Sequence, residues 1–190
     1  TGGRQDQWAS ALGGIQHLQF HGDTVTSTQL NPSPEFMSWI EENLLLFDSG
    51  ISHVSGDLHQ EVWRKYSMGD QDIKNGLERI RHMTQEMLEA IQIESPEHFA
   101  RSLYRTSWSV NLLGKEFNEP FEKYLKPLQF NEAIMAWKVM GAGAGGVVGI
   151  VLNNGYDRET VTELANKQGW TEIEWAIEHQ GIVREVNLHE

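Results

Sequence analysis

The chain has 190 residues, 39% hydrophobic and 22% charged, a composition that is typical of a folded globular protein and excludes a disordered or fibrous chain. Its 27 acidic and 15 basic residues give a net charge of −12, and because so acidic a surface repels a nucleic-acid backbone, we expect no nucleic-acid partner. The absence of cysteine excludes disulfides, thiolate zinc sites and a cysteine nucleophile, and it fits a reducing compartment such as the cytoplasm.

A short helix and a hairpin are expected near the start of the chain. Gln5–Leu12 has a helical pattern that ends at Gly13-Gly14, where a positive φ is often needed. Ile15–Phe20 and Thr24–Leu30 alternate in polarity, and the Gly22-Asp23 pair between them is typical of a hairpin turn. The pattern therefore predicts one helix followed by two antiparallel strands.

The proline-rich segment Asn31–Pro34 is the clearest loop and a candidate domain boundary. We expect residues 1–31 to be the end of one domain and residues 32–190 to form a second. The chain begins at Thr1 without a methionine, in what looks like a glycine-rich turn. We therefore also expect a fragment, or a processed chain whose N-terminal half is missing.

The middle of the chain combines one short strand with two long helices. Leu44–Phe47 is a continuous apolar run that predicts a buried strand, and Asp48–Gly50 predicts the turn after it. Apolar residues between Ile73 and Ile91 recur at spacings close to multiples of 3.6, which predicts a long helix. Ser95 followed by Pro96 is typical of the start of a second helix, and further helical or irregular structure runs to about Leu128.

The C-terminal part mixes strands with one helix. Val147–Leu152 predicts a strand and is far too short to span a bilayer, and no signal-peptide pattern is seen, so we expect a cytoplasmic protein with no membrane partner. Asp157 is expected to cap a helix that runs to about Gln168, and strands are expected around Ile173–Ile177 and Ile182–Val186. The whole pattern predicts an α+β fold in which helices pack on one face of an antiparallel sheet.

Between the last two long apolar segments lies a run of small residues: Gly141, Ala142, Gly143, Ala144, Gly145 and Gly146. Its G-x-G-x-x-G spacing does not indicate a dinucleotide-binding loop, because a strand-like segment follows where that loop requires a helix. It is not a Walker A loop either, since Val147-Val148 stand in place of Lys and Ser or Thr. Two interpretations stay open: a backbone that approaches a ligand and offers its N–H groups, or a hairpin packed tightly under a neighbouring element.

A carboxylate at the other end of the chain is the second candidate for chemistry. Asp6 falls in the first turn of the predicted helix, where the helix dipole favours a negative charge. It could simply stabilise that helix. Alternatively it orients a substrate hydroxyl, with Arg4 as a nearby cation for a phosphate or a charged transition state.

These two segments together resemble the GHMP kinase superfamily. Gly2–Gln7, followed by Ala9–Gly14, is similar to the sugar-kinase branch, which includes L-fucokinase and the D-glycero-D-manno-heptose 7-phosphate kinases. Lys138–Gly146 is similar to the third, C-terminal motif of the family. The resemblance covers essentially the whole chain and implies the C-terminal portion of such a kinase, with the ferredoxin-like C-terminal domain preceded by a short piece of the N-terminal domain.

The resemblance also implies chemistry. Members of the family transfer the γ-phosphate of ATP to a hydroxyl of a small molecule, with Mg²⁺ as the metal ion. The role of catalytic base or orienting carboxylate would fall on Asp6, and Gly141–Gly146 would lie on the substrate and nucleotide side. The implied substrate is a sugar or a sugar phosphate, and a homodimer is compatible with the resemblance.

Further substrate contacts are expected beside these two motifs. Trp8 could form a wall against a sugar ring, and turn or loop residues could hydrogen-bond to sugar hydroxyls; the full set is Gln7, Trp8, Ser49, Gly50 and Ser52. Ser52 and Ser55 are equally typical of turn and helix capping. His53 and His59 lie in the same segment and are expected to be surface or cap residues rather than ligands.

Several family features are missing from this sequence. The phosphate-binding second motif and the N-terminal substrate motif are absent, and most Mg²⁺ ligands of the family lie in those parts, so no metal ligand is expected in this chain. We therefore expect this chain alone to be inactive and to need an N-terminal kinase half as its partner. A catalytically inactive sensor of sugar and ATP, or a free-standing ligand-binding module, are the alternatives.

Overall fold

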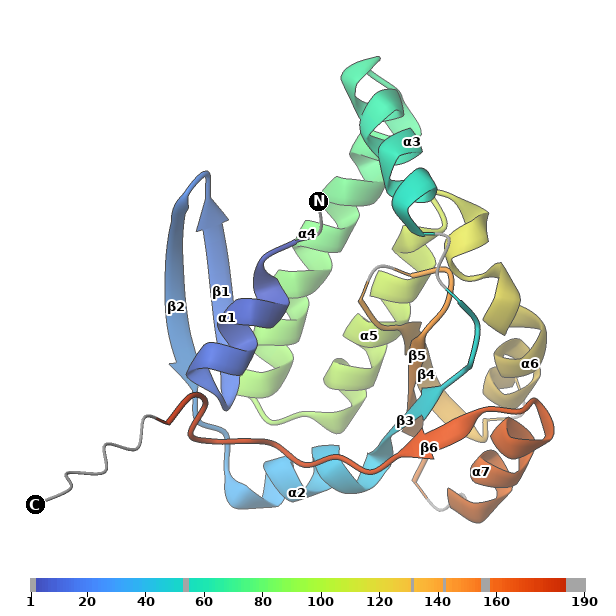
Figure 1. Ribbon diagram of the computed structural model, residues 1–190. Helices are drawn as coiled ribbons and strands as arrows, with labels where there is room; N and C mark the ends of the chain where they lie inside the picture. The colour runs from blue at the N-terminus through green and yellow to red at the C-terminus, as the bar shows by residue number, and fades with distance from the viewer. Residues whose placement is uncertain (1–2, 53–54, 131, 142, 155–157, 184–190) are drawn as a thin grey trace, which may run out of the picture.

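The computed structural model describes residues 3–52, 55–130, 132–141, 143–154 and 158–183, and it contains two antiparallel sheets (Figure 1). The strands are β1 (Ile15–His21), β2 (Thr24–Leu30), β3 (Leu44–Asp48), β4 (Ile134–Val139), β5 (Val147–Leu152) and β6 (Thr171–Ile173). The helices are α1 (Gln5–Leu12), α2 (Pro34–Asn43), α3 (Ser55–Ser67), α4 (Gln71–Gln92), α5 (Pro96–Val110), the short 3-10 helix η1 (Lys115–Phe117), α6 (Glu119–Phe130) and α7 (Arg158–Lys167). β1 and β2 form a hairpin, and the other strands form a sheet in the order β4-β5-β3-β6. The predicted α+β class with an antiparallel sheet is therefore confirmed.

The N-terminal helix and hairpin form where the sequence predicted them. α1 ends at Gly13, whose φ of 69° lies in the left-handed region that favours glycine. In the hairpin, Ile15 lies opposite Leu30 and His21 opposite Thr24, so the tight turn falls on Gly22-Asp23. The turn chemistry at these positions was therefore sufficient to predict the local structure.

Three of the described helices begin with a side-chain cap. Ser33, Asp70 and Ser95 each accept a hydrogen bond from the backbone of the first turn of α2, α4 and α5. α4 and α5 confirm the two long helices predicted from sequence. α2 was not predicted, although Ser33-Pro34 is the same start signal as Ser95-Pro96 and the buried Phe36 and Ile40 lie four residues apart.

α3 corrects the sequence analysis, which treated the segment after Ser49-Gly50 as a loop. Ser55 and His59 lie within this helix. Its interior side, which includes Val62, packs with Ile73 and Phe117, while Trp63 is 59% exposed. Leu58, Val62 and Tyr66 follow one another at intervals of four residues, a helical spacing that the sequence analysis did not use.

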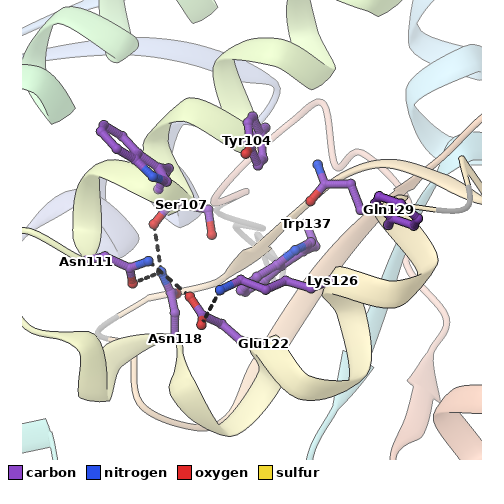
Figure 2. A pocket seen from close by; sticks show the side chains of 10 residues that line it. Tyr104, Ser107, Asn111, Asn118, Glu122, Lys126, Gln129 and Trp137 are labelled. Atoms are coloured by element: carbon purple, nitrogen blue, oxygen red, sulfur yellow. Dashed lines mark hydrogen bonds and ion pairs between the residues drawn. The ribbon is translucent and has the colours of Figure 1, made fainter.

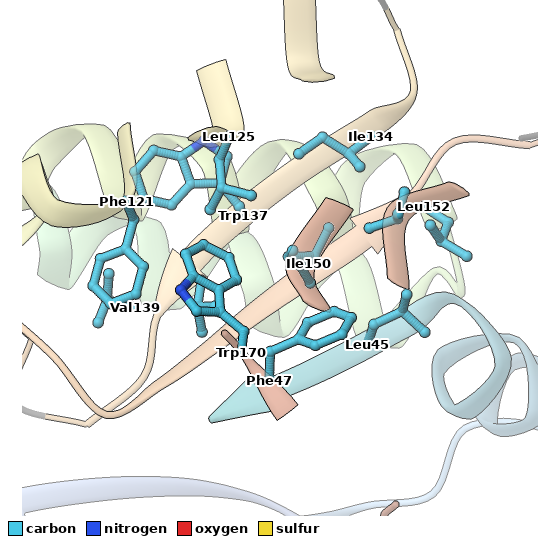
Figure 3. Packing of buried hydrophobic residues seen from close by; sticks show 13 residues of the cluster. Leu45, Phe47, Phe121, Leu125, Ile134, Trp137, Val139, Ile150, Leu152 and Trp170 are labelled. Atoms are coloured by element: carbon cyan, nitrogen blue, oxygen red, sulfur yellow. The ribbon is translucent and has the colours of Figure 1, made fainter. Parts of the chain in front are cut away.

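Helices cover both faces of the four-stranded sheet, not only one (Figure 1). On one face, Phe47 and Ile150 pack with side chains of α6 and α7, and Figure 3 shows this cluster. On the other face, Val151 packs with α2, α4 and α5. The physical reason is that the central strands are apolar at consecutive positions, so both of their faces must be removed from water.

The C-terminal segment is a strap rather than the predicted pair of strands. Only β6 is a strand, and residues 174–183 continue without strand pairing along α2 toward α1 (Figure 1). The backbone N–H of Gly14 donates to the carbonyl of Glu178, and that of Ile182 donates to Ala11. A side chain on Gly13 would lie 2.3 Å from the nitrogen of Gly181, so this crossing depends on glycine. The rest of the predicted last strand lies outside the described residues.

Across the described ranges, we find no helix that combines the length and the apolar character needed to cross a bilayer.

Candidate functional site

The glycine loop connects β4 to β5 and lies directly against the turn that follows β3. The hydroxyl and the backbone N–H of Ser49 both donate to the carbonyl of Gly146, at 2.6 and 3.0 Å. The N–H of Gly146 in turn donates to the carbonyl of Ile51 at 3.0 Å. Two of the segments singled out from sequence, Ser49-Gly50 and the glycine loop, are therefore brought together by the pairing of β3 with β5.

The small residues of the loop allow close backbone packing on two sides. A Cβ on Gly145 would lie 2.6 Å from the Ile51 carbonyl oxygen, and one on Gly143 would lie 2.7 Å from the Phe117 ring. The N–H of Ala144 donates to the Phe117 carbonyl at 2.9 Å. The tightly packed alternative is therefore correct for these positions, and the N–H groups of Ala144 and Gly146 already have protein acceptors.

One end of the loop stays open. Gly141 has a φ of 63°, and among the described residues, its own chain neighbours aside, no atom lies within 4 Å of the position that its Cβ would occupy. This glycine is needed for its backbone conformation, not for packing, and it leaves space above the loop for a bound group. Ala142 lies outside the described residues.

Lys138 is a cation that the sequence analysis included in the glycine motif but did not single out. It is half-buried on β4, three residues before the open glycine, and its ammonium donates to the Val139 carbonyl at 2.8 Å. Burial lowers the pKa of this lysine, because a charged ammonium loses hydration there. The signal in the sequence was one charged residue inside the apolar strand Ile134–Val139.

Asp6 lies in the first turn of α1, and α1 packs beside β1 of the hairpin (Figure 1). Its side chain is exposed and, within the part of the chain that the structure describes, makes no hydrogen bond or ion pair. The guanidinium of Arg4 donates to the Gly22 carbonyl and lies 5.5 Å from the centre of the Phe20 ring, so Arg4 ties the start of α1 to the hairpin. Gln7 is exposed and Trp8 is half-buried.

The remaining predicted contacts have different surroundings. The Ser49 hydroxyl donates to Gly146 and accepts from the Ile51 N–H at 3.2 Å, so it supports the turn from within. Gly50 has a φ of 65° and open space around it, and Ser52 is exposed. The His59 ring packs against Phe117 at 5.5 Å, while His53 lies outside the described residues. No three acidic or histidine side chains of the described ranges are grouped so that they could bind a metal ion.

Gly145→Ala tests the packing of the loop. Because the new Cβ would meet a backbone carbonyl at 2.6 Å, we expect the free energy of unfolding to fall by ~1–3 kcal/mol in denaturant titrations. The control is Gly141→Asn, which places a residue that tolerates a positive φ in open space and should cost less than about 1 kcal/mol. Equal denaturant concentrations at the unfolding midpoints of the two variants would contradict the close contact between the loop and Ile51.

The chain is similar to kinases of known structure and activity. A search of protein-family models finds none that matches. The D-glycero-alpha-D-manno-heptose 7-phosphate kinase of Campylobacter jejuni is 24% identical over 175 residues, which are 90% of this chain and 50% of that protein. A D-glycero-D-manno-heptose 1-phosphate kinase from Bacteroides thetaiotaomicron has a TM-score of 0.66 at 18% identity, covering 95% of this chain and 48% of that one. Mevalonate kinase from L. major has a TM-score of 0.67 at 12% identity, covering 93% of this chain and 52% of that one.

These matches show the fold of the chain. The chain has the α+β fold of the C-terminal part of the GHMP kinases, a superfamily of small-molecule kinases, and it spans about half the length of the relatives it matches. Its sequence is similar to that of one sugar-phosphate kinase, the heptose 7-phosphate kinase. The resemblance predicted from the two motifs is therefore confirmed.

Proposed function

We propose that this chain is the C-terminal part of a kinase that transfers the γ-phosphate of ATP to a hydroxyl of a sugar or a sugar phosphate. The observation that carries the proposal is that a chain similar over 90% of its length to a heptose 7-phosphate kinase has an acid at the start of α1 with no partner among the described residues, and a glycine loop supported by the β3 turn. We further propose that residues 1–31 belong to the end of the N-terminal kinase domain and residues 32–190 to the C-terminal domain. The partner of this chain is then an N-terminal half that carries the phosphate-binding motif.

In this proposal Asp6 orients or deprotonates the acceptor hydroxyl. No described residue forms a hydrogen bond or ion pair with the Asp6 carboxylate, and this supports the role, because a carboxylate already engaged in a salt bridge would have to break it in order to accept a proton. Arg4 is held by Gly22 through one guanidinium nitrogen, and its other N–H groups are the proposed contacts to a charged phosphate oxygen. Gln7 and Trp8 follow on the same helix as proposed substrate contacts, together with Gly50 and Ser52 at the β3 turn.

ATP and Mg²⁺ are the proposed co-substrate and metal ion. The open backbone at Gly141 fits a group that approaches the loop closely, and the basic residue Lys138 precedes this glycine by three positions in the sequence. The N–H groups of Ala144 and Gly146 do not fit a phosphate cradle, because both donate to protein carbonyls. The loop therefore supports a nucleotide site as one wall, and Mg²⁺ would take its ligands from outside the described residues.

The direct test is phosphate transfer by the full-length protein. With Mg-ATP and a panel of free sugars and sugar phosphates, we expect ADP release that depends on one member of the panel, and a phosphorylated product visible by ³¹P NMR. Binding of a sugar together with ATP, without any turnover, would favour the sensor. The absence of both binding and turnover over the whole panel would contradict the proposal.

A further inference from the structure

A cavity of about 570 Å³ lies between α5, α6 and β4, apart from the glycine loop (Figure 2). Its volume falls in the range of about 300–1,000 Å³ that small-molecule sites occupy. Among the described residues, its lining includes none from α1, from the β3 turn or from the glycine loop. It is therefore distinct from the site proposed for phosphate transfer.

Aromatic rings form the walls of this cavity. Tyr104 and Trp108 lie one helical turn apart on α5 and are 42% and 51% exposed, and Phe130 at the end of α6 is 88% exposed. Trp137 of β4 is buried and closes the floor. Single exposed rings are common on protein surfaces, but three around one concavity are typical of a binding site. The guanidinium of Arg79 lies 5.1 Å from the Trp108 ring centre and helps to hold that ring in place.

A hydrogen-bonded polar network lies beside these rings (Figure 2). Asn118 donates through Nδ2 to the Ser107 carbonyl at 2.6 Å and to Asn111 Oδ1 at 2.9 Å. Asn111 donates through its own Nδ2 to Glu122 Oε1 at 3.0 Å. These contacts fix the orientation of both amides and of the carboxylate before any ligand binds. Binding would therefore cost little side-chain conformational entropy.

The network is balanced in charge. Burial alone would raise the pKa of Glu122, but hydrogen bonds from Lys126 and Asn111 outweigh it and lower that pKa, so Glu122 is ionised at neutral pH. Lys126 Nζ lies 2.6 Å from Glu122 Oε2 and neutralises it. The cavity therefore offers no uncompensated positive charge to a phosphate or a carboxylate.

Spare hydrogen-bonding capacity remains in the cavity. The Ser107 side chain is buried in its lining, and the Ser107 hydroxyl has no hydrogen-bond partner among the described residues. A buried hydroxyl without a partner costs free energy, which a hydrogen-bonding occupant would recover. The Glu122–Lys126 pair and the Gln129 amide add acceptors and donors at the rim.

We propose that this cavity is a second, non-catalytic binding site for a neutral pyranose sugar. A pyranose presents an apolar C–H face that matches the rings of Trp108 and Tyr104, and a set of hydroxyls that both donate and accept, as the amide and carboxylate network requires. Its lack of charge matches the neutral Glu122–Lys126 pair. The proposal does not rest on the proposed kinase activity.

The test measures sugar binding at this cavity by saturation-transfer NMR on the full-length protein. The probes are the methyl glycosides of glucose, galactose, mannose and fucose, each with its anomeric hydroxyl blocked. We expect at least one of them to bind, and Trp108→Ala to weaken that binding about tenfold through loss of the stacked ring. Phe130→Ala should weaken it too. The matched control is Trp63→Ala, which removes a ring of similar exposure from α3, outside the cavity.

Three kinds of binding result would contradict the proposal. Binding that survives in both the Trp108 and Phe130 variants, or that is lost in Asp6→Asn, places the sugar elsewhere. Binding of ATP or a sugar phosphate that depends on Trp108, without binding of any glycoside, overturns the neutral class of ligand. No binding of any glycoside at millimolar concentration overturns the site itself. Failure of phosphate transfer alone leaves this proposal intact.

Discussion

Asp6→Asn is expected to lower kcat for phosphate transfer by about 10²–10⁴-fold in the full-length protein. Asparagine keeps the shape of the side chain but cannot accept the proton of the acceptor hydroxyl. Because this side chain is exposed and has no partner among the described residues, the substitution should change the free energy of unfolding by less than about 1 kcal/mol, the size of a helix-dipole contribution. The measurement is steady-state kinetics with Mg-ATP and the sugar identified in the transfer assay, beside a denaturant titration.

The matched control for Asp6 is Asp72→Asn. Asp72 is also an exposed acid in the first turn of a helix, at the start of α4, so it shares the electrostatic role without a proposed catalytic one. We expect Asp72→Asn to match Asp6→Asn in stability and to keep normal turnover. Equal turnover in the two variants would assign Asp6 to helix stabilisation only and remove the central residue of the proposed mechanism.

Phe121→Ala is expected to lower the free energy of unfolding by ~3–5 kcal/mol, the largest stability effect that we predict. Phe121 is fully buried at the start of α6, and its ring centre lies 5.6 Å from that of Trp170 in the cluster that Figure 3 shows. Truncation leaves a cavity between α6 and the sheet that rigid strands cannot close. Urea titration followed by tryptophan fluorescence provides the measurement.

Phe130→Ala supplies the comparison on the same helix. Phe130 is 88% exposed, so its removal should change the free energy of unfolding by no more than about 0.5 kcal/mol. Both variants replace a phenylalanine of α6 by alanine, so the change in helix propensity is the same. The difference between their free energies of unfolding therefore reports the effect of burying the ring. Similar midpoints for both would mean that α6 is not packed on the sheet through Phe121.

Helix start and stop residues predicted the local structure correctly, whereas segments that are ordered by contacts with distant parts of the chain were not predicted. Start and stop residues such as Ser95-Pro96 and Gly13-Gly14 act on the backbone next to them, so they predicted α5 and the end of α1 correctly. α3 was missed although Leu58, Val62 and Tyr66 have helical spacing, and residues 174–177 and 182–183 were predicted to be strands but have no strand pairing. Both are ordered by packing against segments that are distant in sequence, which no local pattern records.

The candidate site was predicted in part. The glycine loop and the Ser49-Gly50 turn were recognised separately from their residues, and the resemblance drawn from the sequence motifs agrees with the fold and with the similarity to a heptose 7-phosphate kinase. The sequence analysis did not distinguish a ligand-binding loop from a packed one. That distinction depended on two contacts between segments that are far apart in the sequence. Ile51, about 94 residues before Gly145, reaches it through the pairing of β3 with β5. Phe117, about 26 residues before Gly143, reaches it from η1.

By itself, the sequence determined the α+β class, the hairpin, the two long helices and the resemblance to sugar kinases, because turn residues, caps and periodicity act over a few positions. Only the tertiary structure decided that helices cover both faces of the sheet, that two N–H groups of the glycine loop are already bonded, and that Asn111, Asn118 and Glu122 line one neutral cavity. These features arise from contacts between elements that are far apart in the chain. Their energies depend on distance and burial, which exist only once the chain has folded.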